Sequence, residues 1–443
     1  MHPSRVIHGR RSMLLAGRRI VLGVSGSIAA IETPRIVREL IRHGAEVRAV
    51  LSPEATRIVS EEALAFATGH PTIVRLTGDV EHVSLLGPGE DRADLLLIAP
   101  ATANTISKIA HGIDDTAVTS CASVALGGGV PILVAPAMHA HMGQNPAVRG
   151  SLERLVSWGV GIVRPDSAEG EEKLASPEEV AAAVLHRLAT GPWAGKNVVV
   201  IGGASRESID DVRSVTNESS GETAVQLAVQ AHYRGATVEL WNGAMQVPVP
   251  RFLPTYPWRS VGDLRALVAA RSTALGVADA VLVPAALSDF TLDRRPGKIA
   301  SRGADVLRLE LRAAPKILPE LRRAVPAPHR LIGFKLESGR DGPALETEAR
   351  RSLRENGLDW VVANDRASLG APETRVALVG PSGPARWLSG TKPEVAGRLL
   401  DLLGPALSRP SRAPASRSKR ASPEEPAPRH RAATRRQIRP RAP

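Results

Sequence analysis

The sequence has almost no cysteine and no long hydrophobic run. Cys121 is the single cysteine among 443 residues, which excludes a disulfide framework and a thiolate metal cluster within one chain. No segment approaches the ~18 consecutive apolar residues that a transmembrane helix needs. The first residues are charged and lack the apolar core of a secretory signal peptide. We therefore expect a cytoplasmic protein that does not enter a membrane.

Positive charge is in excess, but it is concentrated at one end of the chain. The net charge is +12, and residues 408–443 hold eleven Lys or Arg against two Asp or Glu, which gives this segment +9 and leaves +3 for residues 1–407. The segment is rich in Arg, Pro, Ala and Ser, a composition that predicts a disordered basic tail. We expect no specific nucleic-acid partner, and contact of the tail with RNA or an acidic surface is the alternative.

Residues 19–190 alternate between apolar runs and amphipathic segments. A helix is predicted after the first run, with its apolar face at residues 36–41 and Gly44 as its stop signal. The runs predict strands at 19–24, 46–51, 95–98 and 132–134. Apolar strands separated by helices favour a parallel sheet that is covered on both faces.

The same pattern restarts after a break near residues 189–195. A helix is predicted at about 222–233, ended by Gly235. Further strands are predicted at 197–201, 236–241, 280–283, 330–334 and 360–362. The sequence therefore predicts an α/β protein of two Rossmann-like three-layer domains, 1–190 and 191–407, followed by the tail 408–443.

Small polar residues follow the predicted strands of the first domain. They lie in the glycine-rich turn 23–27 and in the segments 99–104 and 135–142. Ligands of open parallel sheets bind beyond the carboxyl ends of the strands, and backbone N–H groups in such turns bind phosphate. One crevice between the three segments is the functional interpretation, and tight turns without a ligand are the alternative. His139 and His141 have no carboxylate or thiolate beside them, so we expect no metal site.

The second domain carries three segments of the same kind. Residues 215–221 open a helix with Ser and Gly, which leave backbone donors free for an anion, and plain helix capping is the alternative. Asp289 follows a buried strand, and Lys298, nine residues later, suits a phosphate contact. Pro315 begins the third segment, which is as compatible with an ordinary helix start as with a binding site.

The motifs of both halves resemble those of one enzyme family. The segments 26–30 (GSIAA), 100–105 (PATANT) and 136–139 (PAMH) resemble the flavin-dependent cysteine decarboxylases. The second half carries, in family order, the motifs at 217–221, 285–290, 298–299, 315–318, 333–335 and 363–365. Residues 1–405 are therefore similar to the bifunctional phosphopantothenoylcysteine decarboxylase/phosphopantothenate–cysteine ligases of coenzyme A synthesis, in particular to their archaeal branch.

The resemblance implies a flavodoxin-like first domain that binds FMN. FMN oxidises the substrate thiol to a thioaldehyde and so creates the electron sink that decarboxylation needs. His82 matches the active-site histidine, and His139 stands where the family often has the asparagine that contacts the substrate carboxylate. The family's lid cysteine is missing from residues 167–173, which leaves Glu171, Glu172, Lys173 or water as the proton donor. The implied flavin contacts are Gly26, Ser27, Ile28, Ser52, Thr102 and Asn104.

For the second domain the resemblance implies a nucleotide-binding ligase. The carboxylate of 4′-phosphopantothenate attacks the α-phosphate of CTP with the help of Mg²⁺, and the amine of cysteine then displaces CMP. Lys298 matches the catalytic lysine, and Asn217 matches the asparagine that holds the acyl intermediate. Glu218 and Glu222 replace basic residues of the family, which keeps ATP open as the nucleotide. The implied nucleotide contacts are Val283, Pro284, Ala285, Asp289, Lys298, Pro315, Lys316, Ile317 and Phe334.

Three other interpretations remain open at this point. One is a flavoprotein with a single active half. Another is a different flavin-dependent decarboxylase or a flavin prenyltransferase, which would need only the first domain. The third is a non-enzymatic interaction protein that acts through its basic tail. By resemblance the first domain forms trimers with FMN at the subunit boundary and the second forms dimers, which together are compatible with a dodecamer.

Overall fold

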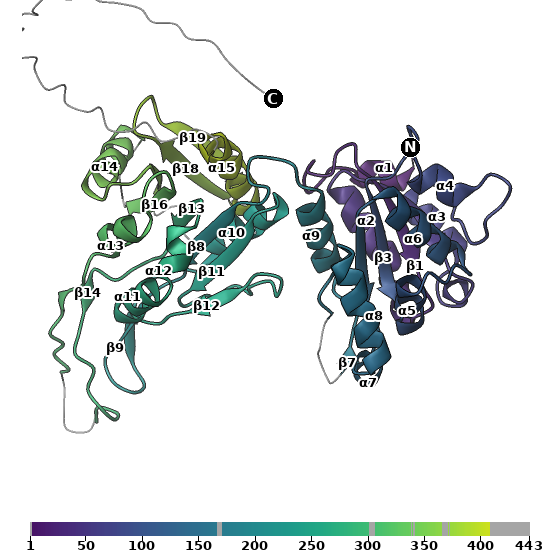
Figure 1. The fold of residues 1–443 in the computed structure, drawn as a ribbon. Coiled ribbons are helices and arrows are strands. Elements are labelled where there is room, and N and C mark those ends of the chain that lie inside the picture. The colour runs from purple at the N-terminus through teal and green to yellow at the C-terminus, as the bar shows by residue number, and fades with distance from the viewer. Residues whose placement is uncertain are drawn as a thin grey trace, which may run out of the picture. The chain divides into compact units, whose positions relative to one another are not determined.

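The computed structural model describes residues 2–165, 171–300, 306–337, 339, 342–365, 371 and 373–407. The predicted basic tail and residues 167–170 of the lid segment 167–173 lie outside these residues. Figure 1 shows two α/β domains joined through the segment that follows α9 (Pro177–Leu188).

The first domain is built on a five-stranded sheet with the order β2-β1-β3-β4-β6, in which every pair is parallel. The strands are β1 (Arg19–Val24), β2 (Glu46–Leu51), β3 (Leu95–Ala101), β4 (Ile132–Pro136) and β6 (Gly161–Ile162). The first four match the predicted strands. The predicted parallel sheet is confirmed.

Alternation along the strands divides the side chains between two cores. On β1, Ile20, Leu22 and Val24 belong to one core, whereas Val21 belongs to the other. The first core is closed by α1 (Pro3–Ile7), α2 (Thr33–Arg42), α3 (Glu61–Thr68) and α9. The second is closed by α4 (Glu81–Leu86), α5 (Ala103–Ala110), α6 (Ala117–Gly128) and α8 (Pro146–Ser157). The domain therefore has the predicted three layers.

Short elements complete this domain near the strand ends. The predicted first helix is interrupted, because residues 28–32 form the 3₁₀-helix η1 (Ile28–Glu32) before α2 begins. A second 3₁₀-helix, η2 (Ala55–Arg57), follows β2. The short strands β5 (Met138–His139) and β7 (Glu171–Glu172) pair antiparallel, and α7 (Ala140–Gly143) follows β5.

The second domain contains an eight-stranded sheet with the order β12-β11-β8-β13-β16-β17-β18-β19. The strands are parallel as far as β17, and the pairs β17–β18 and β18–β19 are antiparallel. Strands β18 and β19 are absent from the sequence-based expectation. The strands are β8 (Asn197–Gly202), β11 (Thr237–Asn242), β12 (Thr255–Pro257), β13 (Ala280–Val283), β16 (Arg330–Glu337), β17 (Trp360–Asp365), β18 (Glu373–Val379) and β19 (Arg386–Thr391).

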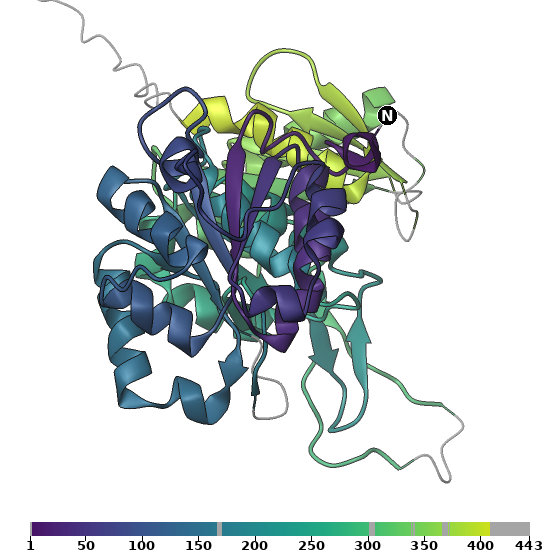
Figure 2. The ribbon, with the colours of Figure 1, turned by 90° about the vertical axis from the view of Figure 1, so that its right-hand side faces the viewer.

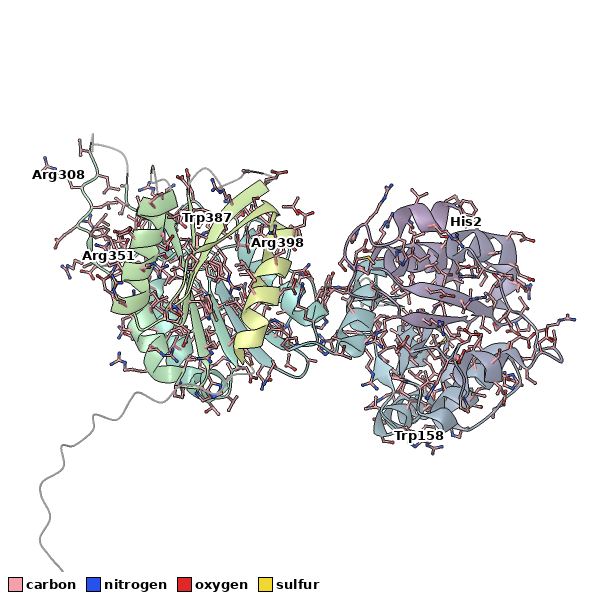
Figure 3. All side chains as sticks on the ribbon, turned by 90° about the horizontal axis from the view of Figure 1, so that it is seen from above. His2, Trp158, Arg308, Arg351, Trp387 and Arg398 are labelled. Atoms are coloured by element: carbon pink, nitrogen blue, oxygen red, sulfur yellow. The ribbon has the colours of Figure 1, made fainter. Side chains whose placement is uncertain are left out.

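Helices cover both faces of this sheet as well. One core contains residues of α10 (Glu222–Tyr233) and α15 (Lys392–Leu407). The other contains residues of α11 (Val261–Ala270), α12 (Ser272–Gly276), α13 (Ile317–Ala324) and α14 (Gly342–Glu355). Figure 3 shows Arg351 on α14 and Arg398 on α15 on opposite sides of the sheet, which carries Trp387 on β19.

Two small antiparallel pairs extend from the second sheet (Figures 1 and 2). The hairpin β9 (Arg206–Ser208) and β10 (Ser214–Thr216) follows β8, and β14 (Phe290–Thr291) pairs with β15 (Arg312–Ala313). The long segment between β14 and β15 contains Lys298.

Candidate functional site

A buried serine joins two strand ends of the first sheet. Ser25, which directly follows β1, is 1% exposed. Its Oγ donates a hydrogen bond to the carbonyl of Pro100 at 2.8 Å and accepts one from the N–H of Thr102 at 2.9 Å. The predicted crevice segments 23–27 and 99–104 therefore meet through Ser25. Nothing in the sequence of the small-residue turn indicates this role for Ser25.

A polar cavity of about 250 Å³ opens beside this junction. Four of the six predicted flavin contacts line it, and Ser27 and Ile28 do not. Ser27 instead caps η1, because its side chain accepts a hydrogen bond from the N–H of Ala29. The cavity is lined by Gly26, Ser52, Glu54, Thr102, Asn104, Thr105, Lys108, Thr116, Thr119 and Met142.

Two helices begin at this cavity. Thr102 caps α5 by accepting a hydrogen bond from the N–H of Thr105 at 3.2 Å, and Thr116 caps α6 in a reciprocal pair with Thr119. The start of a helix carries partial positive charge and favours a bound anion. A Cβ at Gly26 would collide with the Cβ of Glu54 and lie 3.2 Å from its backbone carbonyl carbon. Only glycine leaves room there, so these residues fit the phosphate-bearing end of a flavin nucleotide.

The two predicted catalytic histidines lie outside the lining of this cavity. His82 is on α4, half-buried, and its buried Nδ1 has no hydrogen-bond partner within the described part of the chain. His139 ends β5, and its Nδ1 accepts a hydrogen bond from the N–H of His141 at 3.3 Å. The backbone of His139 is paired with that of Glu171, which brings the described end of the lid segment beside it.

Cys121 lies in α6 and is buried. Burial, assisted by the negative charges of Asp114 and Glu81, raises the pKa of its thiol to about 12. The group is therefore protonated at neutral pH and is a poor nucleophile. Within the described ranges, no group of three or more His, Cys, Asp or Glu could hold a metal ion.

A larger cavity of about 530 Å³ lies in the second domain. It collects segments that are far apart in the sequence, including three of the predicted nucleotide contacts. Its lining includes Ser219, Ser220 and Gly221 at the start of α10, Pro284 and Ala285 after β13, Phe334 on β16 and Asn364 on β17. The predicted motifs 217–221, 285–290, 333–335 and 363–365 therefore converge on one cavity.

Asn217 and Ser205 hold the backbone beside this cavity in place. The Nδ2 of Asn217 donates hydrogen bonds to the carbonyls of Ala286 and Leu287 at 3.2 and 2.9 Å. The buried Oγ of Ser205 accepts one from the N–H of Ser288 at 2.9 Å. The exposed Asn217 is thus tied to the segment that follows β13.

The other predicted nucleotide contacts lie elsewhere. Asp289 forms an ion pair with Lys316 at 2.6 Å, and both side chains are more than 70% exposed, so the pair contributes little stability. Val283 and Ile317 are buried in the core, and Pro315 is exposed. None of these residues lines the larger cavity.

Lys298 is exposed on the segment between β14 and β15, whose backbone is anchored on both sides of it. The N–H of Gly297 donates to Asp211, and the N–H of Ile299 donates to Asp210, each at 3.1 Å. Asp210 is buried, and hydrogen bonds from the N–H groups of Val212, Arg213 and Ile299 hold the pKa of its carboxyl below the ordinary value. The turn after β9 thus fixes the backbone that carries Lys298.

The larger cavity is also lined by a pair of oppositely charged residues, of which the sequence indicates only one. Lys392 and Glu222 both line it, with Nζ and Oε2 2.5 Å apart. Glu222 is a predicted departure from the family, but nothing in the sequence indicates that Lys392, 170 residues away, is its partner. The carboxylate of Glu222 is therefore neutralised by a lysine from α15.

Comparisons with known proteins match both domains. The family model described as "Flavoprotein" matches residues 8–189. The model described as "DNA/pantothenate metabolism flavoprotein C-terminal domain" matches residues 193–405. In the part of the chain that the structure describes, no helix is long and apolar enough to cross a membrane.

Curated relatives match nearly the whole chain. The coenzyme A biosynthesis bifunctional protein CoaBC of Thermococcus kodakarensis is 41% identical over 90% of this chain and 98% of its own length. The protein of the same name from Methanocaldococcus jannaschii is 35% identical over 90% of this chain and 97% of its own. That from Bacillus subtilis is 32% identical over 81% of this chain and 88% of its own.

Proposed function

Since the chain belongs to the family of coenzyme A biosynthesis bifunctional proteins, we propose that its two domains catalyse consecutive reactions. The second domain ligates cysteine to 4′-phosphopantothenate, and the first decarboxylates the product to 4′-phosphopantetheine. The observation that carries this proposal is the pair of cavities, one at the strand ends of each sheet and each lined by several of the ordered motifs. A flavoprotein with one active half, or a flavin prenyltransferase, would leave the second cavity without a role.

The first domain is proposed to bind FMN, which supplies a two-electron oxidation of the substrate thiol. Gly26, Ser52, Thr102 and Asn104 would hold the cofactor, and the starts of α5 and α6 would neutralise its phosphate. His82 would accept the thiol proton, since its buried Nδ1 is free of any other described hydrogen bond. His139 would donate a hydrogen bond to the substrate carboxylate.

His82 is not among the residues that line the cavity of its own chain, which is compatible with a site shared between subunits. In a trimer with FMN at the subunit boundary, the histidine of one protomer would serve the cavity of its neighbour. Dimer contacts through the second domain would then give a dodecamer. The absence of His82 from the cavity lining within one chain is the observation that favours such an assembly.

The second domain is proposed to activate the carboxylate of 4′-phosphopantothenate with CTP. Backbone N–H groups at the start of α10 would hold phosphate, and Lys298 would stabilise the charge that develops at the α-phosphate. Asn217 would hold the acyl intermediate until the amine of cysteine displaces CMP. Mg²⁺ would enter with the nucleotide, whose phosphate oxygens are its usual ligands. The apolar lining by Phe334 and Leu399 would exclude water from the intermediate.

Incubation with a single nucleotide tests the ligase half. With protein that carries no FMN, we expect phosphopantothenoylcysteine, CMP and pyrophosphate from 4′-phosphopantothenate, cysteine, Mg²⁺ and CTP, identified by mass. Turnover with ATP instead of CTP would correct the nucleotide but keep the ligase. No product with either nucleotide would overturn the ligase assignment. For the first domain, flavin absorbance that remains after desalting from added FMN is the expected result.

A further inference from the structure

The larger cavity contains an ion pair between the first residues of two helices. Glu222 begins α10 and Lys392 begins α15, and their charged atoms are 2.5 Å apart. The side chain of Lys392 is 11% exposed and that of Glu222 is 34% exposed. Lys392 is therefore a nearly buried cation on the cavity wall, with a more accessible carboxylate as its partner.

The position of Lys392 is electrostatically unfavourable for the helix that carries it. The start of a helix has partial positive charge, so a lysine in the first turn opposes it. The start of α15 is already compensated by Glu394, whose carboxylate accepts a hydrogen bond from the N–H of Thr391 at 2.9 Å. Helix formation thus gives no reason for a lysine at this place.

The start of α10 adds positive potential to the same wall. Its cap is Gly221 in the left-handed conformation (φ 76°), which supplies no side-chain hydrogen bond to the helix. Ser219 and Ser220 precede it on the cavity wall, and the exposed Glu218 lies at the outer end of this segment. Two helix starts and Lys392 therefore lie beside the carboxylate of Glu222.

We propose that Lys392 binds a phosphate group of a ligase substrate and that Glu222 occupies this lysine in the free protein. This inference rests on the ligase function proposed above. A phosphate carries more charge and more acceptor oxygens than a carboxylate, so it displaces Glu222, whose partly exposed side chain can turn to solvent. The phosphate belongs either to the nucleotide or to 4′-phosphopantothenate.

Glu222→Gln and Lys392→Gln, made in the full chain, test this proposal by calorimetry. CTP, ATP and 4′-phosphopantothenate are titrated separately in the presence of Mg²⁺, with cytidine as the ligand without phosphate. Loss of one charged hydrogen bond typically weakens binding about tenfold or more. We therefore expect Lys392→Gln to lower the affinity for a phosphate-bearing ligand by about that factor. Glu222→Gln should raise the affinity for the same ligand severalfold.

Matched controls come from ion pairs outside the cavity. Lys196→Gln removes a lysine paired with Asp279 at 3.0 Å, and Glu320→Gln removes a carboxylate paired with Arg265 at 3.0 Å. Both should leave every affinity unchanged. Lys392→Arg keeps the charge and should retain most of the binding, which separates loss of charge from loss of fold.

The ligand whose affinity moves identifies the source of the phosphate. The proposal is overturned if both cavity variants weaken binding of the same ligand or if neither variant changes the affinity for any ligand. It is also overturned if the affinity for cytidine changes as much as that for the phosphate-bearing ligands. Failure of the ligase function is a different result, because wild-type protein would then bind none of the three phosphate-bearing ligands and form no phosphopantothenoylcysteine.

Discussion

Ser25→Ala should destabilise the first domain and weaken FMN binding together. The substitution removes the hydrogen bond to the carbonyl of Pro100 and leaves the N–H of Thr102 without its acceptor. The carbonyl of Pro100 keeps a second bond, from the N–H of Ser25 at 3.2 Å. The main cost is therefore the unpaired N–H of Thr102, at about 1–3 kcal/mol, and we take about 2 kcal/mol as the loss of unfolding free energy.

The assay is a thermal melt of the whole protein, followed by flavin fluorescence. For a domain of this size a loss of about 2 kcal/mol lowers Tm by roughly 4–8 °C. FMN affinity should fall as well, because Thr102 lines the cavity and caps α5. Ser151→Ala is the control: Ser151 is 2% exposed, and its Oγ lies 2.8 Å from the carbonyl of Ala147 in its own helix and 3.5 Å from the Oγ of Ser107, so its loss leaves no backbone N–H without an acceptor. A Ser25→Ala protein that melts and binds FMN like the wild type would refute the reasoning.

Four further predictions concern single steps or groups. Lys298→Gln should slow pyrophosphate release without cysteine by roughly 10²–10³, with Lys196→Gln unchanged, and a wild-type rate would remove the lysine from the mechanism. His82→Asn should abolish release of carbon dioxide from phosphopantothenoylcysteine while ligation continues, and proportional loss of both activities would contradict separate sites. A chain ending at Leu407 should keep both activities, and loss of ligation would assign the tail a role in catalysis. The pKa of Cys121, raised from 9.0 to about 12, should protect the native thiol from iodoacetamide at pH 8, and because the unfolded thiol ionises first, its contribution to stability should fall as pH rises above 9.

The sequence was sufficient for the frame of both sheets. Continuous apolar runs identified β1 and β8, because strands that are buried on both faces consist almost entirely of apolar residues. The helix predicted at 222–233 coincides with α10, whose glycines on both sides mark its ends. Strands β18 and β19 were missed because their apolar segments are short: only the second half of β18 is buried, and Leu388 is the one buried residue of β19.

Contacts between distant segments were beyond the reach of sequence reasoning. Ser25 looked like part of a small-residue turn, and its role depends on a strand end 75 residues away. Lys392 pairs with Glu222 only because α10 and α15 lie on the same face of the sheet. The motif residues Asp289 and Lys298 lie on segments outside the larger cavity, so their nucleotide contacts remain predictions.

One conversion tests the central claim most directly. Purified protein loaded with FMN is given 4′-phosphopantothenate, cysteine, Mg²⁺ and CTP, and the products are identified by mass. Two active domains in one chain predict 4′-phosphopantetheine, carbon dioxide, CMP and pyrophosphate, with phosphopantothenoylcysteine accumulating instead in the His82→Asn variant. Accumulation of phosphopantothenoylcysteine by the wild type, or no consumption of 4′-phosphopantothenate with either CTP or ATP, would contradict the account.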